Sequence, residues 1–110
     1  MKQETIKKIL QFRDERDWKQ FHNGKDLALS LSLEASELLE VYQWSGDDLF
    51  CLDKLDKIKE ELADILMYSV LLSDCYNINL DEIINDKLQL NIKKYPVSKA
   101  KGKKEKYDEL

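Results

Sequence analysis

The sequence has few residues that break helices, because its 110 residues include only three glycines and one proline. Glycine and proline are the residues that most often end or kink a helix, so we expect long elements. No segment alternates apolar and polar residues in the way that a half-buried strand does. The sequence therefore predicts an all-α chain.

Other absences narrow the class of protein. Basic residues are not in excess, since 18 Lys and Arg stand against 22 Asp and Glu, and we therefore expect no nucleic-acid partner. No apolar run reaches the length of a membrane span, and the start "MKQETIKKILQF" lacks the apolar core of a signal peptide. The two cysteines, Cys51 and Cys75, lack metal-binding spacing and are expected to be reduced thiols. We expect a cytoplasmic protein that does not associate with membranes.

Apolar periodicity predicts four helices. They cover residues 4–18, residues 27–44, a segment that begins between residues 47 and 56 and ends near residue 75, and a segment from residue 79 to Pro96. Asp26 is expected to cap the second helix, and Asn79 with Glu82 to form a capping box at the start of the fourth. Pro96 is expected to end that last helix.

The predicted helices suggest one domain with a tail. We expect residues 1–97 to form an antiparallel four-helix bundle-like domain, and residues 98–110, with five lysines between Lys99 and Lys106, to form the tail. The tail is expected to be solvated, with folding over a phosphate site as the alternative. Because a chain of this length buries a small core, we expect a partner subunit to complete the burial.

Two pairs of carboxylates lie on apolar helix faces. A helical wheel places Glu34 inside the most apolar stripe of its helix, with Glu37 beside it. Glu61 and Asp64 share a face with Tyr68 and with apolar neighbours. Burying an ionised carboxylate costs several kcal/mol unless a cation or a proton compensates it. Antiparallel packing of the two helices would therefore gather four carboxylates that require a cation.

A simpler interpretation stays open at this point. Carboxylates three residues apart are common on acidic helices, and a nearby lysine such as Lys57 could neutralise them. If a metal is present, its identity follows from the missing ligands: the only histidine, His22, falls in a predicted loop. Zinc and iron sites in helical bundles usually include His or Cys, whereas ligation by oxygen alone favours Mg²⁺ first and Mn²⁺ second. Mg²⁺ commonly completes its shell with phosphate oxygens, which predicts a polyphosphate ligand.

The spacing of the four carboxylates resembles the signature of the MazG-like all-α nucleoside triphosphate pyrophosphohydrolases. The pattern here is Glu34-x-x-Glu37, then 23 residues, then Glu61-x-x-Asp64. The likeness covers about residues 12–110 and is strongest to the dCTP pyrophosphatase branch. The stretches that carry it are "FHNGKDLALSLSLEASELLEVYQW", "ELADILMY", "KLQLNIKKYPV" and the terminal "KYDEL".

This resemblance implies a fold, an activity and a set of site residues. It implies an antiparallel helical bundle that forms a homo-oligomer, a dimer or a tetramer. It also implies hydrolysis of a nucleoside triphosphate between the α and β phosphates, giving the monophosphate and pyrophosphate, as nucleotide-pool housekeeping. The implied Mg²⁺ ligands are Glu34, Glu37, Glu61 and Asp64, and one glutamate of the first pair aligns the attacking water. The implied substrate contacts are His22, Trp44 and Tyr68 at the base and sugar, and Lys87, Asn91 and Tyr95 at the phosphates or sugar.

Alternatives remain for both the residues and the function. Trp44 also fits a core or interface position, His22 and Lys87 also fit solvated positions, and Asn91 with Tyr95 also fits a capping or packing role. A related enzyme for dUTP, phosphoribosyl-ATP or another nucleotide is one alternative, because base selectivity depends on a few hydrogen bonds. The other alternative is a non-catalytic helical oligomeric or regulatory module whose acidic residues form a structural metal site.

Overall fold

The computed structural model describes all 110 residues, and every regular element in it is helical. The α-helices are α1 (Gln3–Glu15), α2 (Gly24–Val41), α3 (Leu55–Cys75), α4 (Leu80–Lys94) and α5 (Val97–Ala100). Short 3₁₀ turns form at Lys19–Phe21, Leu52–Lys54 and Tyr107–Glu109. The all-α prediction is confirmed. None of the helices combines the length and the apolar composition that crossing a membrane requires.

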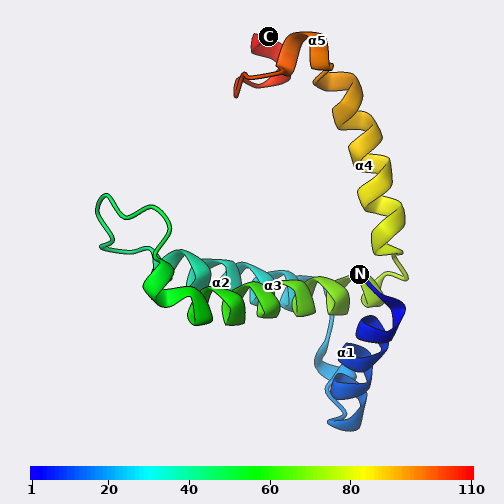
Figure 1. Cartoon of the computed structure of the whole chain (residues 1–110). Helices are drawn as coiled ribbons and strands as arrows, with labels where there is room; N and C mark the ends of the chain where they lie inside the picture. Colours follow the sequence, from blue (N-terminus) through cyan, green and yellow to red (C-terminus); the bar gives the residue numbers. More distant parts are fainter. The chain divides into compact units, whose positions relative to one another are not determined.

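Contacts within the chain divide it into two parts, residues 1–78 and residues 79–110. In the first part, α2 and α3 lie side by side as an antiparallel pair (Figure 1). Their connecting loop is held by Asp48, whose Oδ1 accepts hydrogen bonds from the backbone N–H groups of Phe50 (3.3 Å) and Cys51 (3.1 Å). Cys51 is buried and has a left-handed backbone (φ 48°). This compact loop fixes where α3 begins to run back along α2.

The start of α2 differs from the prediction. Its N-cap is Asn23, whose side-chain oxygen accepts from the backbone N–H of Asp26 at 2.8 Å. Asp26 instead lies in the first turn, where a negative charge interacts favourably with the helix dipole. A Cβ at Gly24 would lie 1.8 Å from the hydroxyl oxygen of Tyr76. A larger residue at position 24 would therefore require the exposed Tyr76 ring to move away from the first turn of α2.

The ends of two helices also come earlier than predicted. Helix α1 ends at Glu15 rather than near residue 18, and Asp17 adopts a left-handed backbone (φ 54°) that turns the chain back. Helix α2 ends at Val41 rather than at residue 44, and Trp44 lies beyond it with φ 67°. Left-handed residues in these stretches are compatible with turns but not with continued helix.

Helix α1 is attached to α3 by a buried arginine. The Arg13 side chain is 4% exposed and donates to Asp74 Oδ2 at 2.6 Å and to Asp14 Oδ1 at 2.8 Å. The rings of Phe12 and Trp18 meet edge to face with centroids 5.6 Å apart. These contacts set the position of α1 and of the turn after it relative to α3.

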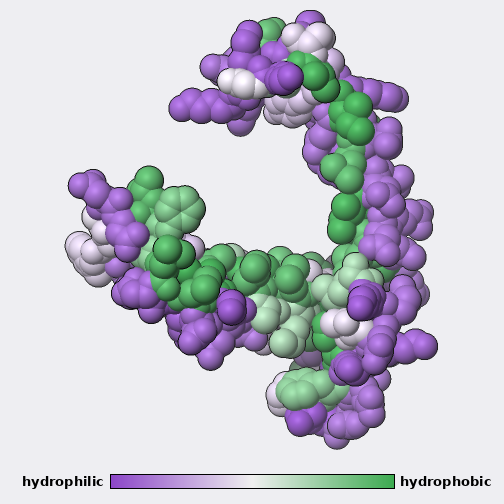
Figure 2. All heavy atoms as spheres, viewed as in Figure 1, coloured by the Kyte–Doolittle hydropathy of each residue, from purple (hydrophilic) through white to green (hydrophobic).

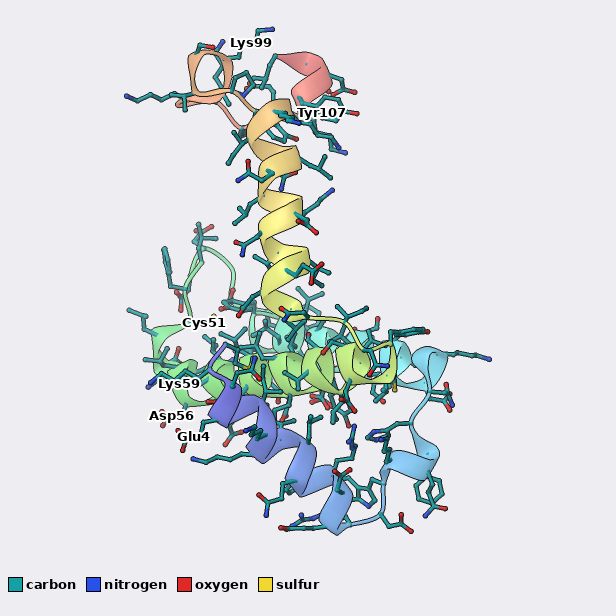
Figure 3. The ribbon with its side chains drawn as sticks, turned by 90° about the vertical axis from the view of Figure 1, so that its right-hand side faces the viewer. Glu4, Cys51, Asp56, Lys59, Lys99 and Tyr107 are labelled. Carbon is teal, nitrogen blue, oxygen red and sulfur yellow. The ribbon has the colours of Figure 1, made fainter.

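At the start of the second part, the predicted cap Asn79 is confirmed. Asn79 caps α4 by accepting from the backbone N–H of Glu82 at 3.0 Å, and the helix ends just before Pro96. The residues after Pro96 include two helical turns, and the Tyr107 ring lies 6.1 Å from the Tyr95 ring, beside the end of α4 (Figure 3). The tail is thus folded against its own helix. The predicted boundary between domain and tail stays a prediction.

The chain buries a small apolar core. Its buried apolar side chains belong to Leu27, Val41, Cys51 and Val70. Leu39 remains 72% exposed, and Leu62 and Leu66, whose periodicity helped to predict α3, remain 47% and 46% exposed. Figure 2 shows hydrophobic surface gathered along the α2–α3 pair and at its loop end. The first part therefore leaves much of its apolar surface uncovered by its own residues.

Candidate metal and nucleotide site

Three of the four predicted carboxylate ligands meet between α2 and α3. Glu34 from α2 and Glu61 and Asp64 from α3 each contribute one oxygen, and these oxygens lie within 4.8 Å of one another. Glu61 is 2% exposed, while Glu34 and Asp64 are half-buried. Residues three or four apart share a helix face, so two antiparallel helices can bring such residues together. We call Glu34, Glu61 and Asp64 the acidic cluster.

The fourth residue, Glu37, is placed differently. It is exposed, one turn after Glu34, and its carboxylate is not part of the acidic cluster. It lines a neighbouring cavity of about 410 Å³ together with Glu40, Val41, Lys57 and Glu61. The structure thus brings Glu37 beside the acidic cluster, on the side where a lysine is also present.

Buried polar atoms without partners are concentrated in this region. Side-chain atoms of this kind in the chain are His22 Nδ1, Glu34 Oε2 and Glu61 Oε2. A buried polar atom that forms no hydrogen bond costs about 1–3 kcal/mol, more if it carries charge. Two of the three are carboxylate oxygens of the acidic cluster, which are the donors that Mg²⁺ and Mn²⁺ prefer. The acidic cluster therefore fits a hard divalent cation that would satisfy both oxygens.

The two glutamates of the acidic cluster have opposite pKa shifts. Burial, followed by the proximity of the Glu37 carboxyl, raises the pKa of Glu34 to about 7. A hydrogen bond from Lys57 lowers the pKa of Glu61 below its ordinary value. Without a metal, a proton on Glu34 and the ammonium group beside Glu61 reduce the repulsion among these carboxyl groups. The contact between Lys57 and Glu61 agrees with the simpler interpretation, in which a lysine neutralises the carboxylate. It still leaves Glu34 Oε2 and Glu61 Oε2 without a hydrogen-bond partner.

A cavity of about 470 Å³ opens beside Asp64, between α1, α3 and the turn at Lys19–Phe21. It brings together three of the predicted site residues, His22, Asp64 and Tyr68. Burial and then the positive charge of Arg13 lower the pKa of His22, so its ring is neutral at physiological pH. The volume lies within the range of small-molecule sites, roughly 300–1,000 Å³.

Sequence reasoning missed several residues of this cavity. They are Thr5, Lys8, Ile9, Phe12, Arg13, Trp18, Met67 and Leu71. Trp18 was expected only as the end of the first helix, and it enters the cavity because the chain turns back at Asp17. The one sequence signal was the presence of two aromatic residues, Phe12 and Trp18, close to the sole histidine.

The other predicted substrate-binding residues are Trp44 in the first part of the chain and three residues in the second part. Trp44 is 92% exposed in the loop after α2 and lines neither cavity. Lys87, Asn91 and Tyr95 lie on or next to α4, in the second part of the chain. Within that part, the backbone carbonyl of Asn91 accepts from the Tyr95 N–H at 2.8 Å, so Asn91 and Tyr95 end the helix.

The fold and the acidic cluster together define an all-α protein with a candidate metal site between two antiparallel helices. The sequence profile of the MazG-like family matches residues 29–110, a span that includes the whole acidic cluster and Glu37. The chain belongs to this family.

Individual relatives agree with this placement. The chain is 34% identical to dCTP pyrophosphatase 1 of Mus musculus and to that of Homo sapiens, over 97% of its own length. It spans 66% of the length of each of these proteins. It is also similar to the crystal structure of a pyrophosphatase from Archaeoglobus fulgidus, with a TM-score of 0.78 and 38% identity over 84% of this chain and 90% of that one.

Proposed function

We propose that this protein is a cytoplasmic, Mg²⁺-dependent nucleoside triphosphate pyrophosphohydrolase that cleaves dCTP or a modified dCTP to the monophosphate and pyrophosphate. The observation that carries the proposal is the acidic cluster, three carboxylate oxygens within 4.8 Å of one another, next to a nucleotide-sized cavity. The names of the relatives, dCTP pyrophosphatase 1 and a pyrophosphatase, support the reaction and the base.

Glu34, Glu61 and Asp64 would hold the cation, with Glu37 as the fourth carboxylate at its edge. A bound Mg²⁺ supplies neutralisation of phosphate charge and in-line orientation of the reacting groups, with Mn²⁺ as a possible substitute. This also explains how a chain with a net charge of −4 binds a polyanion. The site uses oxygen donors alone, in agreement with the absence of histidine from both helices.

One glutamate of the α2 pair, Glu34 or Glu37, aligns the attacking water. Glu37 is the more exposed of the two, and its carboxyl group lies beside those of Glu34 and Glu61. An exposed carboxylate beside a metal site can accept a proton from water without losing a metal bond. Burial raises the pKa of Glu34 to about 7, so Glu34 would have to lose its proton to serve as a ligand of the cation.

The cavity beside Asp64 takes the base and the sugar. Phe12 and Trp18 offer planar apolar walls, and His22, Arg13 and Tyr68 offer the few polar groups that select one base over another. The structure brings Trp18 to this cavity, so Trp18 is the tryptophan that we propose to stack on the base, while the role of Trp44 stays a prediction. Lys87, Asn91 and Tyr95 are proposed to reach the phosphates or the sugar from the second part of the chain.

We further propose that the protein works as a homo-oligomer, a dimer or a tetramer. The uncovered leucines of the α2–α3 pair support this, with Leu33 65% and Leu39 72% exposed. Contiguous apolar surface of this kind on a small chain is typical of subunit contacts. Light scattering on the purified protein measures its mass in solution and thereby the number of subunits.

A panel of triphosphates tests the proposed reaction and its base preference. The assay measures pyrophosphate and monophosphate released from dCTP, dUTP and other nucleotides with and without Mg²⁺. We expect metal-dependent release of pyrophosphate, with dCTP or a modified dCTP as the best substrate. A structural metal module would instead give no turnover and only a higher melting temperature with Mg²⁺.

A further inference from the structure

The acidic cluster already contacts a cation that belongs to the chain. Lys57 Nζ lies 2.8 Å from Glu61 Oε1, one helical turn earlier on α3. The Glu61 side chain is 3% exposed, whereas the Lys57 side chain is 57% exposed and reaches in from the surface. The second oxygen of Glu61, Oε2, is buried and has no partner. Glu61 therefore has one oxygen bound to an ammonium group and one that remains available for a metal.

Lys57 also has other carboxylates to which it can turn. Glu60 Oε2 lies 3.8 Å from its Nζ, on the exposed side of α3. The 410 Å³ cavity that Lys57 lines also contains Glu37 and Glu40. A lysine carries its charge on a flexible four-carbon stem, so changing partners costs little as long as another carboxylate is within reach.

We propose that Lys57 is the counter-ion of the acidic cluster in the metal-free protein, and that it lowers the affinity of the cluster for a divalent cation by competing for Glu61. On metal binding, the Lys57 ammonium group turns to Glu60, which lies outside the metal site. This inference rests on the proposed metal site. It assigns to Lys57 a role in setting metal affinity, separate from the role of the ligands themselves.

The size of the effect follows from Coulomb's law. Moving a unit charge away from a divalent cation at about 6 Å changes the binding constant by roughly tenfold in water, and by less once salt screens it. We therefore expect removal of the Lys57 charge to tighten Mg²⁺ binding by about three- to tenfold. Because Glu61 would then be buried without its ammonium partner, the metal-free protein should also unfold at a lower temperature.

The test compares Lys57→Gln with Lys59→Gln, using Mg²⁺ alone as the probe on the full chain. Lys59 lies two residues later, near the start of the same helix, and is exposed (Figure 3). The Lys59→Gln substitution also removes one positive charge, but it leaves the Lys57–Glu61 ion pair in place. Isothermal titration calorimetry gives the dissociation constants, and thermal unfolding in a chelator gives the stability of the metal-free forms.

The expected result is a Mg²⁺ dissociation constant three- to tenfold lower for Lys57→Gln, and within about twofold of the wild type for Lys59→Gln. Lys57→Arg, which keeps the charge, should restore the wild-type value. Equal or weaker Mg²⁺ binding by Lys57→Gln would overturn the inference while leaving the metal site intact. A wild-type protein that binds no Mg²⁺ would overturn both the inference and the proposed metal-dependent function.

Discussion

At the scale of single residues, two glutamates of the acidic cluster, Glu34 and Glu61, ionise differently because their neighbours differ. Glu61 is held ionised by Lys57, whereas burial and neighbouring carboxyls raise the pKa of Glu34 to about 7. A lysine and a proton thus compensate the acidic cluster when no metal is bound. Both the lysine and the proton compete with a divalent cation, which makes metal binding sensitive to pH and to the charge at position 57.

The Glu34 proton predicts how stability changes with pH. Its pKa rises from 4.5 in the unfolded chain to about 7 in the metal-free fold, so the folded state holds the extra proton between these values. The contribution of Glu34 to stability therefore falls as the pH rises from about 4.5 to about 7. Glu34→Gln removes this dependence.

Thermal unfolding in a chelator checks this prediction. The melting temperature of Glu34→Gln should exceed that of the wild type by a few degrees above neutral pH, and the difference should shrink toward pH 4.5. Other groups titrate in both proteins, so the difference between the two proteins isolates Glu34. A difference that is constant over this pH range would contradict the raised pKa.

The structure and the sequence point to different tryptophans as the residue that stacks on the base: Trp18 lines the cavity, whereas the sequence predicts Trp44. Trp18→Ala removes an aromatic wall of the cavity, and loss of base stacking of about 1–3 kcal/mol predicts a KM for dCTP about tenfold higher. Trp44→Ala, at a position 92% exposed, should raise it less. Steady-state kinetics measure the KM of both variants, and Trp18→Phe is the control that keeps an aromatic ring at this position. If Trp18→Ala leaves KM unchanged, the base does not occupy this cavity.

At the scale of elements, capping signals predicted some helix ends and missed others. Asn79 was correctly identified as the cap of α4, because Glu82 follows it at the spacing of a capping box. Asn23 was missed in favour of Asp26, although both carry a side-chain acceptor. Helices α1 and α2 end early because the chain turns at residues with a left-handed backbone, such as Asp17 and Trp44. No pattern in the sequence predicts a left-handed conformation at these positions.

The attachment of α1 to α3 should depend on Arg13. Arg13→Met replaces a buried guanidinium that bonds Asp74 at 2.6 Å, and it leaves Asp74 without its ion-pair partner. Because Asp74 is 29% exposed and partly hydrated, we expect a loss of about 1–3 kcal/mol in the free energy of unfolding.

Urea denaturation measures this loss. Arg16→Met, at the residue that follows α1, is the comparison, since that side chain is 43% exposed and its loss should cost about 1 kcal/mol or less. Arg13→Met should also weaken nucleotide binding, because α1 forms one wall of the cavity. Equal stabilities for the two variants would show that the buried ion pair does not fix α1.

At the scale of the whole molecule, the acidic cluster was more predictable than the cavity. Helical periodicity, which a sequence encodes locally, places Glu61 beside Asp64, and antiparallel packing of two helices that follow one another in the chain brings Glu34 to them. The cavity depends on the turn at Asp17 and on the docking of α1 through Arg13, which are long-range consequences of folding. Lys57 was considered only as a neutralising neighbour, and its contact with Glu61 emerged from the structure.

The central claim is that the acidic cluster holds the metal for cleavage between the α and β phosphates. The most direct test is product analysis by ³¹P NMR with dCTP and Mg²⁺, for the wild type, Asp64→Asn and the exposed control Asp53→Asn. We predict dCMP and pyrophosphate in equal amounts from the wild type and the control. Asp64→Asn should lose at least about 100-fold in rate while remaining folded by circular dichroism. Stepwise release of orthophosphate, or full activity in Asp64→Asn, would contradict the account.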